Sequence, residues 1–340
     1  MALIDTLAPL RAHAGARRTR GLDDATVLRF AASHPDLAEA IAAAGEEYAR
    51  VRGEFPELLE LDEAEQAVAI QGGFVNFYSQ DTVNPYVALV ARGPWVITLK
   101  GAVLHDSGGY GMLGFGHAPK AVIEAMSRPQ VMANIMTPNL SQLRFDRAIR
   151  AEVGHSRGAD GACPYDKFLC LNSGSESVSL AARIADVNAK LMTDPGAQYA
   201  GRTIKRVVVK GSFHGRTDRP ALYSDSTRKT YLQHLASFRG ESSVIAVEPY
   251  DADALRKVFA DADANGWFIE AMFLEPVMGE GDPGRSVPRA FYDAARKLTA
   301  THGSLLLVDS IQAGLRAHGV LSIVDYPGFE GLDAPDMETY

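Results

Sequence analysis

The sequence predicts an α/β protein with an open, mostly parallel β-sheet. After residue 166, five short apolar runs alternate with stretches of helical character, and each run is nearly continuous in apolar residues. Strands that are buried on both faces have this pattern, as in a parallel sheet covered by helices. A helical stretch at 289–299, between the last two runs, has the place of a crossover helix. The five runs include Phe168, Val207, Val244, Met272 and Leu305.

The first third of the chain has a different pattern. Apolar residues recur at helical spacing between Asp23 and Glu65, which predicts helices that pack or cover a dimer surface rather than carry chemistry. Residues 87–93 and 95–101 predict paired strands. A glycine cluster then runs from 107 to 117, which indicates close approach to a ligand or, alternatively, a flexible turn.

These changes of pattern predict three parts of the chain. We expect an N-terminal helical extension over residues 1–84. The N-terminal part of a small domain and a linker would occupy 85–150. A large domain would occupy 151–340. A length of 340 residues agrees with roughly two domains.

Composition excludes several classes of protein. With 34 basic and 42 acidic residues the net charge is −8, which argues against nucleic acid as a partner. Two cysteines, Cys163 and Cys170, form neither a disulfide framework nor a zinc site, so no metal is expected and a reducing compartment is the default. No apolar run reaches the roughly 18 residues of a membrane span. The sequence therefore predicts a soluble, cytoplasmic protein without membrane contact.

Polar residues follow the apolar runs at the strand ends where ligands bind in such sheets. Ser173, Gly174 and Ser175 precede a helical stretch, and free N–H groups with two hydroxyls at a helix start suit a phosphate. A serine that only caps the helix is the alternative. Phe213 and His214 follow the next run, where an aromatic ring can stack on a flat ligand or simply fill the core.

Carboxylates follow the last two runs. Glu275 and Glu280 are five residues apart, which fits an acid–base or charge-pairing role as well as two solvated side chains. Asp309 closes an apolar run, and burying it is costly unless it meets a cation. The protonated nitrogen of a heterocycle would be such a cation, and a helix cap is the alternative.

Taken in order, these segments resemble the class III, pyridoxal-phosphate-dependent aminotransferases of the ornithine, acetylornithine, 4-aminobutyrate and lysine ε-aminotransferase group. The resemblance covers about residues 85–340. It implies the aspartate aminotransferase-like fold type I, with a mostly parallel seven-stranded sheet, helices on both faces and a small α+β domain. The matching segments are the glycine loop at 106–117, the phosphate turn at 172–177, the ring-stacking motif at 213–217, and the motifs at 275–281 and 309–312.

The resemblance implies that pyridoxal 5′-phosphate is the cofactor and that the large domain binds it. The phosphate would lie against Ser173, Gly174 and Ser175, and the ring between Phe213 and Ile311. His214 belongs to the same ring-stacking motif. Asp309 would be the catalytic partner of the ring nitrogen, and Gln312 would bond near the ring hydroxyl. Tyr110 and Glu280 match positions that contact substrate, the latter paired with a mobile arginine.

Some positions depart from the family's pattern. Ser310 stands where the family usually has Glu, Met278 where it has Gln, and Arg316 lies one position early. The family's Schiff-base lysine follows shortly after a Pro-Asp segment, which Pro335 and Asp336 match here. No lysine occurs between Asp309 and Tyr340, so the resemblance implies that this lysine would follow just after Tyr340. The large domain is therefore expected to continue past residue 340, and the C-terminal domain and the arginine partner of Glu280 are expected there too.

The resemblance implies a homodimeric transaminase. It would move an amino group from an amine or amino acid, an ω-amine in particular, to a 2-oxo acid such as 2-oxoglutarate. A PLP-dependent aminomutase of the same fold is one alternative, which the position of Arg316 leaves open. A non-catalytic cofactor-binding protein is the other.

Overall fold

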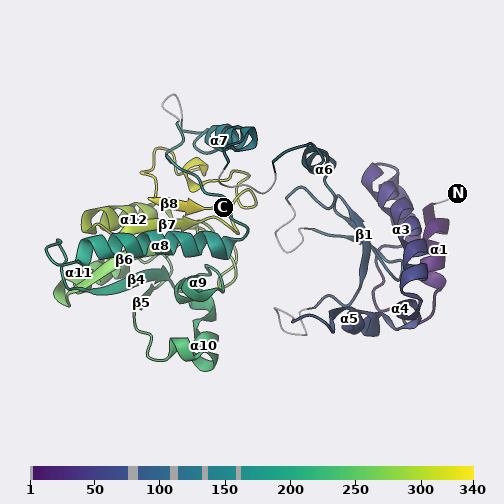
Figure 1. The fold of residues 1–340 in the computed structure, drawn as a ribbon, viewed down its shortest axis with the longest axis horizontal. Coiled ribbons are helices and arrows are strands. Elements are labelled where there is room, and N and C mark those ends of the chain that lie inside the picture. Colours follow the sequence, from purple (N-terminus) through teal and green to yellow (C-terminus); the bar gives the residue numbers. More distant parts are fainter. Residues whose placement is uncertain (1–2, 76–82, 108–113, 132–136, 158–161) are drawn as a thin grey trace. The chain divides into compact units, whose positions relative to one another are not determined.

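The computed structural model describes residues 3–75, 83–107, 114–131, 137–157 and 162–340 (Figure 1). The chain forms two compact units, Met1–Met132 and Ala133–Tyr340. Within the described residues, no helix is long and apolar enough to cross a membrane.

The first unit is a helical layer on a small antiparallel sheet. Its sheet has the order β1-β2-β3, and α3 packs on β1 and β2. The helices and paired strands predicted for this part of the sequence are confirmed. The elements are α1 (Leu3–Ala12), α2 (Asp24–Ala31), α3 (Pro35–Glu54), α4 (Pro56–Glu60), α5 (Glu63–Gln71), β1 (Ala88–Arg92), β2 (Trp95–Thr98), β3 (Val103–His105) and α6 (Lys120–Met126).

The second unit contains the predicted parallel sheet. Its described strands have the order β5-β4-β6-β7-β8, and every neighbouring pair is parallel. The strands are β4 (Thr203–Val209), β5 (Val244–Val247), β6 (Trp267–Leu274), β7 (Leu305–Asp309) and β8 (Met337–Thr339). The helical elements are α7 (Leu140–Glu152), α8 (Gly174–Thr193), α9 (Asp218–Tyr223), α10 (Asp225–His234), η3 (Ala236–Phe238), α11 (Ala252–Ala264), α12 (Arg289–His302) and η4 (Ile323–Asp325).

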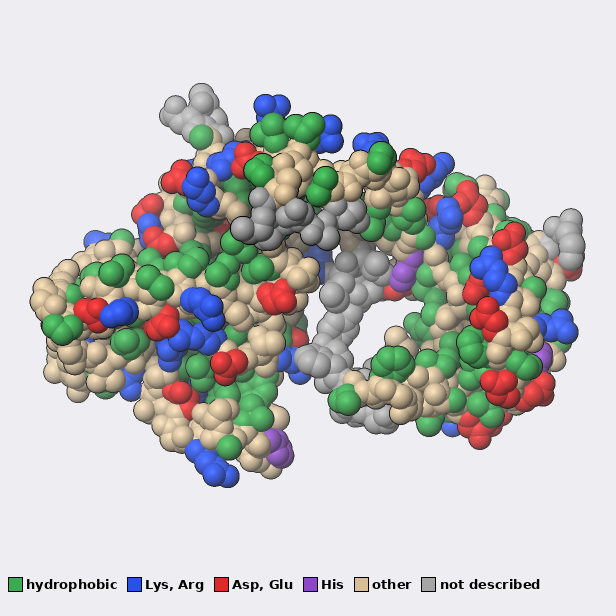
Figure 2. All heavy atoms as spheres, in the orientation of Figure 1, with side chains coloured by type: hydrophobic (Ala, Val, Ile, Leu, Met, Phe, Trp, Pro, Cys, Tyr) green, Lys and Arg blue, Asp and Glu red, His purple; other side chains and the backbone are tan. Residues whose placement is uncertain are grey.

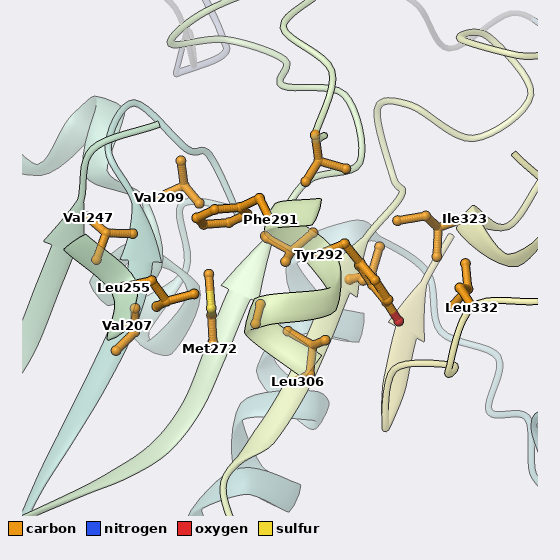
Figure 3. Packing of buried hydrophobic residues seen from close by; sticks show 14 of the residues in the cluster. Val207, Val209, Val247, Leu255, Met272, Phe291, Tyr292, Leu306, Ile323 and Leu332 are labelled. Carbon is orange, nitrogen blue, oxygen red and sulfur yellow. The ribbon is translucent and has the colours of Figure 1, made fainter. Parts of the chain in front are cut away.

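Both faces of this sheet are buried, as the continuous apolar runs predict. Along β6, Met272 and Leu274 pack with residues of α11 and α12, including Phe259 and Phe291. Figure 3 shows Met272 and Phe291 in this cluster. Ala271 and Phe273 point to the other face, against α8 and α9. Alternate side chains therefore enter two separate cores. The predicted crossover helix is confirmed as α12.

The strand predicted at Phe168 is wrong. Residues 168–171 form no strand, and Leu169 and Leu171 are 63% and 42% exposed. A cavity of about 530 Å³ separates this segment from β8, the last strand of the sheet. An apolar run becomes a strand only where a neighbouring strand offers backbone hydrogen bonds, and among the described residues none lies beside this segment. The described residues thus form five parallel strands rather than the seven implied by the family.

The division of the chain differs from the predicted boundaries at 84 and 150. The N-terminal helices share one core with β1 and β2, with Leu37 and Ile41 of α3 beside Trp95 and Ile97. Residues 1–84 are therefore part of the first unit rather than an extension of it. At the other boundary, Arg150 of α7 donates to the carbonyls of residues 165 and 166, which joins α7 to the second unit.

Candidate active site

A cavity of about 190 Å³ lies where β4, β6 and β7 end and α8 begins. All eight residues that the family resemblance assigns to the cofactor line it. Parallel strands end at the same edge of a sheet, so residues far apart in sequence meet there. The lining residues are Ser173, Gly174, Ser175, Phe213, His214, Gly215, Glu275, Asp309, Ile311 and Gln312.

The start of α8 forms one end of this cavity. Ser173 is the N-cap residue, and its Oγ accepts a hydrogen bond from the N–H of Glu176 at 3.2 Å, so the capping alternative describes this hydroxyl correctly. Ser175 lies against the loop after β4. A Cβ on Gly215, whose φ is +118°, would lie 2.5 Å from the Ser175 Oγ. The loop can pack against the helix start only because residue 215 is glycine.

Asp309 lines a buried part of the cavity, with 5% of its surface exposed. Its Oδ2 lies 2.9 Å from Nδ1 of His214, which is itself buried. Its Oδ1 accepts hydrogen bonds from the hydroxyl of Thr339 at 3.0 Å and from the N–H of Ile311 at 3.2 Å. Three donors from three segments thus fix the direction of the carboxylate. The helix-cap alternative for Asp309 is not what the structure has, because residues 311–318 form turns rather than a helix.

Glu275 connects two of the loops around the cavity, a role that sequence reasoning missed. Its Oε1 accepts from the N–H of Phe213 and its Oε2 from the N–H of Gly279, both at 2.8 Å. Burial raises its pKa to about 7, although His214 and the two N–H groups oppose the shift. Its place in the motif at 275–281 was the available signal, but the two partners are backbone groups that no motif names.

Glu280 meets an arginine within the described chain. Arg216 Nη2 lies 3.4 Å from Glu280 Oε2, and its guanidinium lies 5.4 Å from the centre of the Phe213 ring. The expectation that the arginine partner of Glu280 lies past Tyr340 is therefore incomplete. Arg216 stands inside the ring-stacking motif, yet its sequence position alone did not reveal that it reaches the loop after β6.

The remaining predicted positions have simpler surroundings. Gln312 packs on Gly279, where any side chain would overlap its amide. Arg316 donates to the carbonyls of Ile311 and Gln312, at 2.6 and 2.7 Å, so it braces the cavity wall. Met278 is buried in the core beside β6. Tyr110 lies outside the described residues.

The residues present fit a phosphorylated heterocycle. The cavity has N–H and hydroxyl donors at the start of α8, which suit a phosphate. A buried carboxylate at Asp309 suits a protonated ring nitrogen, and the side chains of Phe213 and Ile311 offer apolar surface for a flat ring. Within the described residues, no group of three or more His, Cys, Asp or Glu side chains is placed to hold a metal.

Comparison with known proteins identifies the family. The model of the family described as "Aminotransferase class-III" matches residues 77–338. The chain belongs to the class III aminotransferases. Its cofactor, as for that family, is pyridoxal 5′-phosphate. This class III aminotransferase chain is 32% identical to acetylornithine aminotransferase of Mycobacterium tuberculosis over 260 residues, 75% of this chain and 56% of the relative.

More distant relatives match the chain by sequence or by structure. Aminotransferase PigE of Serratia sp. is 27% identical over 247 residues, which are 71% of this chain and 25% of PigE. The structure of ornithine aminotransferase from Toxoplasma gondii superposes with a TM-score of 0.60 at 22% identity, over 81% of this chain and 60% of that one. The second unit therefore has fold type I. The chain spans little more than half the length of the acetylornithine aminotransferases that it matches.

Proposed function

We propose that the full-length protein is a transaminase that moves an amino group from an amine or amino acid to a 2-oxo acid. The observation that carries the proposal is the meeting of all eight assigned cofactor residues around one cavity with Asp309 in a buried part of it. An ω-amine as donor and 2-oxoglutarate as acceptor are the finer part of the proposal. The cofactor's ring, when bound, accepts electrons from the substrate carbon that loses a proton.

The protein's own residues would hold and tune the cofactor. The N–H groups of Ser173, Gly174 and Ser175, together with the hydroxyl of Ser175, would bind the phosphate. Asp309 would keep a proton on the ring nitrogen, since the ionised carboxylate favours the charged form of its neighbour. His214 supports this role because its bond to Oδ2 holds the carboxylate in one direction.

The contact between Arg216 and Glu280 suggests how one site could take two kinds of substrate. An arginine is suited to bind a substrate carboxylate. In this structure the Arg216 guanidinium pairs with the Glu280 carboxylate, with 3.4 Å between the nearest nitrogen and oxygen. A donor with no carboxylate at this end would leave the pair together. A dicarboxylate acceptor such as 2-oxoglutarate would compete with Glu280 for the arginine.

We further propose a cytoplasmic homodimer whose second unit, which includes the predicted large domain over 151–340, binds the cofactor. The support for a dimer is exposed apolar surface on α7 and α8. Figure 2 shows hydrophobic side chains at the surface of this unit. Such surface on a water-exposed unit indicates an interface. The exposed apolar residues of the two helices are Leu140, Leu143, Phe145, Ile184, Val187 and Leu191.

A donor panel tests the proposal. Full-length protein loaded with pyridoxal 5′-phosphate is mixed with single amines or amino acids and either 2-oxoglutarate or pyruvate. We expect glutamate or alanine to form only when a donor is present, with the fastest turnover for an ω-amine and 2-oxoglutarate. Bound cofactor without amino transfer to either acceptor would contradict the proposal and leave a binding protein or an aminomutase.

A further inference from the structure

A carboxylate in β8 is surrounded by hydrogen-bond donors from three other segments. Glu338 Oε1 accepts from the hydroxyl of Ser310 at 2.7 Å and from the N–H of Ile323 at 2.9 Å. Its Oε2 accepts from the hydroxyls of Tyr165 at 2.7 Å and Ser322 at 2.5 Å. These bonds join β8 to the end of β7, to the loop before α8 and to η4.

The hydroxyl of Tyr340, the second residue after Glu338, also donates to Oε2, at 3.2 Å. This cluster, formed by Glu338 and its five donors, adjoins Asp309. Ser310 follows Asp309 directly, and its N–H donates to the carbonyl of Thr339 at 2.8 Å. Thr339 follows Glu338, and its hydroxyl donates to Asp309 Oδ1 at 3.0 Å. Ser310 and Glu338 are the chain neighbours of Asp309 and Thr339, and they are therefore hydrogen-bonded to each other as well. A shift of β8 along β7 would separate Thr339 from Asp309.

Stability alone does not account for such a cluster. Burial raises the pKa of Glu338 above its usual range, although the surrounding donors oppose this shift. Replacing buried ionic groups by apolar ones is often neutral or stabilising. Several directional bonds to one carboxylate do, however, select a single alignment of the segments that donate them. A serine at position 310 is compatible with this arrangement. The family's usual Glu at that position would place a second carboxylate beside Glu338, and the two like charges would repel.

We propose that Glu338 is a positioning residue for Asp309. It aligns the ends of β7 and β8 so that Thr339 directs Asp309 Oδ1. Glu338 acts through Ser310 and Thr339 and touches neither cofactor nor substrate. This inference rests on the proposed function, since the alignment matters only if Asp309 meets the cofactor's ring nitrogen.

Cofactor binding by the full-length protein tests the proposal. The dissociation constant of pyridoxal 5′-phosphate is measured by equilibrium dialysis, and the absorbance of the bound cofactor is titrated with pH. The variants are Glu338→Gln, Ser310→Ala and their double variant, with Asp309→Asn as reference. Ser304→Ala is the matched control, because Ser304 is a buried serine just before β7 whose hydroxyl has no partner among the described residues.

We expect Glu338→Gln and Ser310→Ala each to weaken binding about tenfold, the effect of about one lost hydrogen bond to a charged group. Both variants should also lower the pH midpoint at which the absorbance of the bound cofactor changes, because a misdirected Asp309 holds the proton on the ring nitrogen less well. Asp309→Asn should shift the midpoint in the same direction. The double variant should lose little more than Glu338→Gln alone. Ser304→Ala should match the unchanged protein.

Two results would overturn the inference while Asp309→Asn still shows its loss. One is an unchanged affinity and midpoint in Ser310→Ala, which also decides the matter if Glu338→Gln does not fold. The other is strictly additive effects in the double variant, which would show that Ser310 and Glu338 act separately. An Asp309→Asn protein with unchanged affinity and midpoint would instead overturn the proposed function.

Discussion

Replacing Glu275 by glutamine should change the free energy of unfolding of the second unit in a pH-dependent way. Relative to the unchanged protein at the same pH, the variant should become more stable as pH rises. Glu275 is 3% exposed, and burial raises its pKa to about 7 from an unfolded value of 4.5. Between these values the folded state binds more protons than the unfolded state, so stability falls as pH increases. The facing titratable groups are His214, Asp309 and Tyr250. Glutamine carries no charge and removes this pH dependence.

The magnitude follows from the shift. A pKa of about 7 against 4.5 is a difference of 2.5, and at about 1.4 kcal/mol for each pH unit this gives roughly 3 kcal/mol. Glutamine has one carbonyl oxygen for two N–H donors, so it loses the bond to either Phe213 or Gly279 at every pH, at a cost of about 1–3 kcal/mol. The difference between the two proteins should therefore change by roughly 3 kcal/mol from pH 4 to pH 8.

Urea unfolding at several pH values measures this change. The chain has two tryptophans, and a Trp95→Phe background leaves Trp267, at the start of β6, as the reporter of the second unit. Glu248→Gln is the control, since Glu248 follows β5, is exposed and pairs with Lys210 at 2.7 Å. A difference in free energy of unfolding between Glu275→Gln and the unchanged protein that is constant with pH, or that disfavours the variant more as pH rises, would refute the reasoning. Such a result would mean that the two N–H bonds lower the pKa of Glu275 by at least as much as burial raises it.

Three further predictions concern the cavity. Asp309→Asn should preserve the fold and weaken cofactor binding only about tenfold, but it should lower kcat by orders of magnitude, because an amide holds no pyridinium proton; near-normal kcat in steady-state assays would contradict this. Glu280→Ala should impair the ω-amine half-reaction more than the 2-oxoglutarate half-reaction in stopped-flow assays, and equal losses would mark Glu280 as structural. Gly215→Ala should weaken cofactor binding at least tenfold in dialysis, because its Cβ would crowd Ser175, whereas Gly284→Ala, with open space around it, should not.

The sequence predicted the parallel sheet well because its strands carry their own signal. Val207 and Met272 lie in runs that are apolar throughout, and both sit between two helical layers. The run at Phe168 has the same composition and forms no strand, since strand formation also needs a neighbouring chain to bond with. The three-residue strand β8 was missed because Glu338 interrupts its apolar pattern.

The residues that line the cavity were predicted better than the residues that hold them in place. Motifs name side chains that meet a ligand, so Ser175, Phe213 and Asp309 could be placed from sequence by resemblance. Thr339 and Glu338 act through partners that are about 30 residues away along the chain but adjacent in space. Such contacts depend on the register of β7 with β8, which no local pattern specifies.

A crystal structure of the full-length protein with pyridoxal 5′-phosphate tests the central claim most directly. The account predicts the phosphate at the start of α8, within hydrogen-bond distance of Ser175. It predicts the ring against Phe213, with its nitrogen within hydrogen-bond distance of Asp309. Cofactor bound elsewhere, or with its nitrogen turned away from Asp309, would contradict the account.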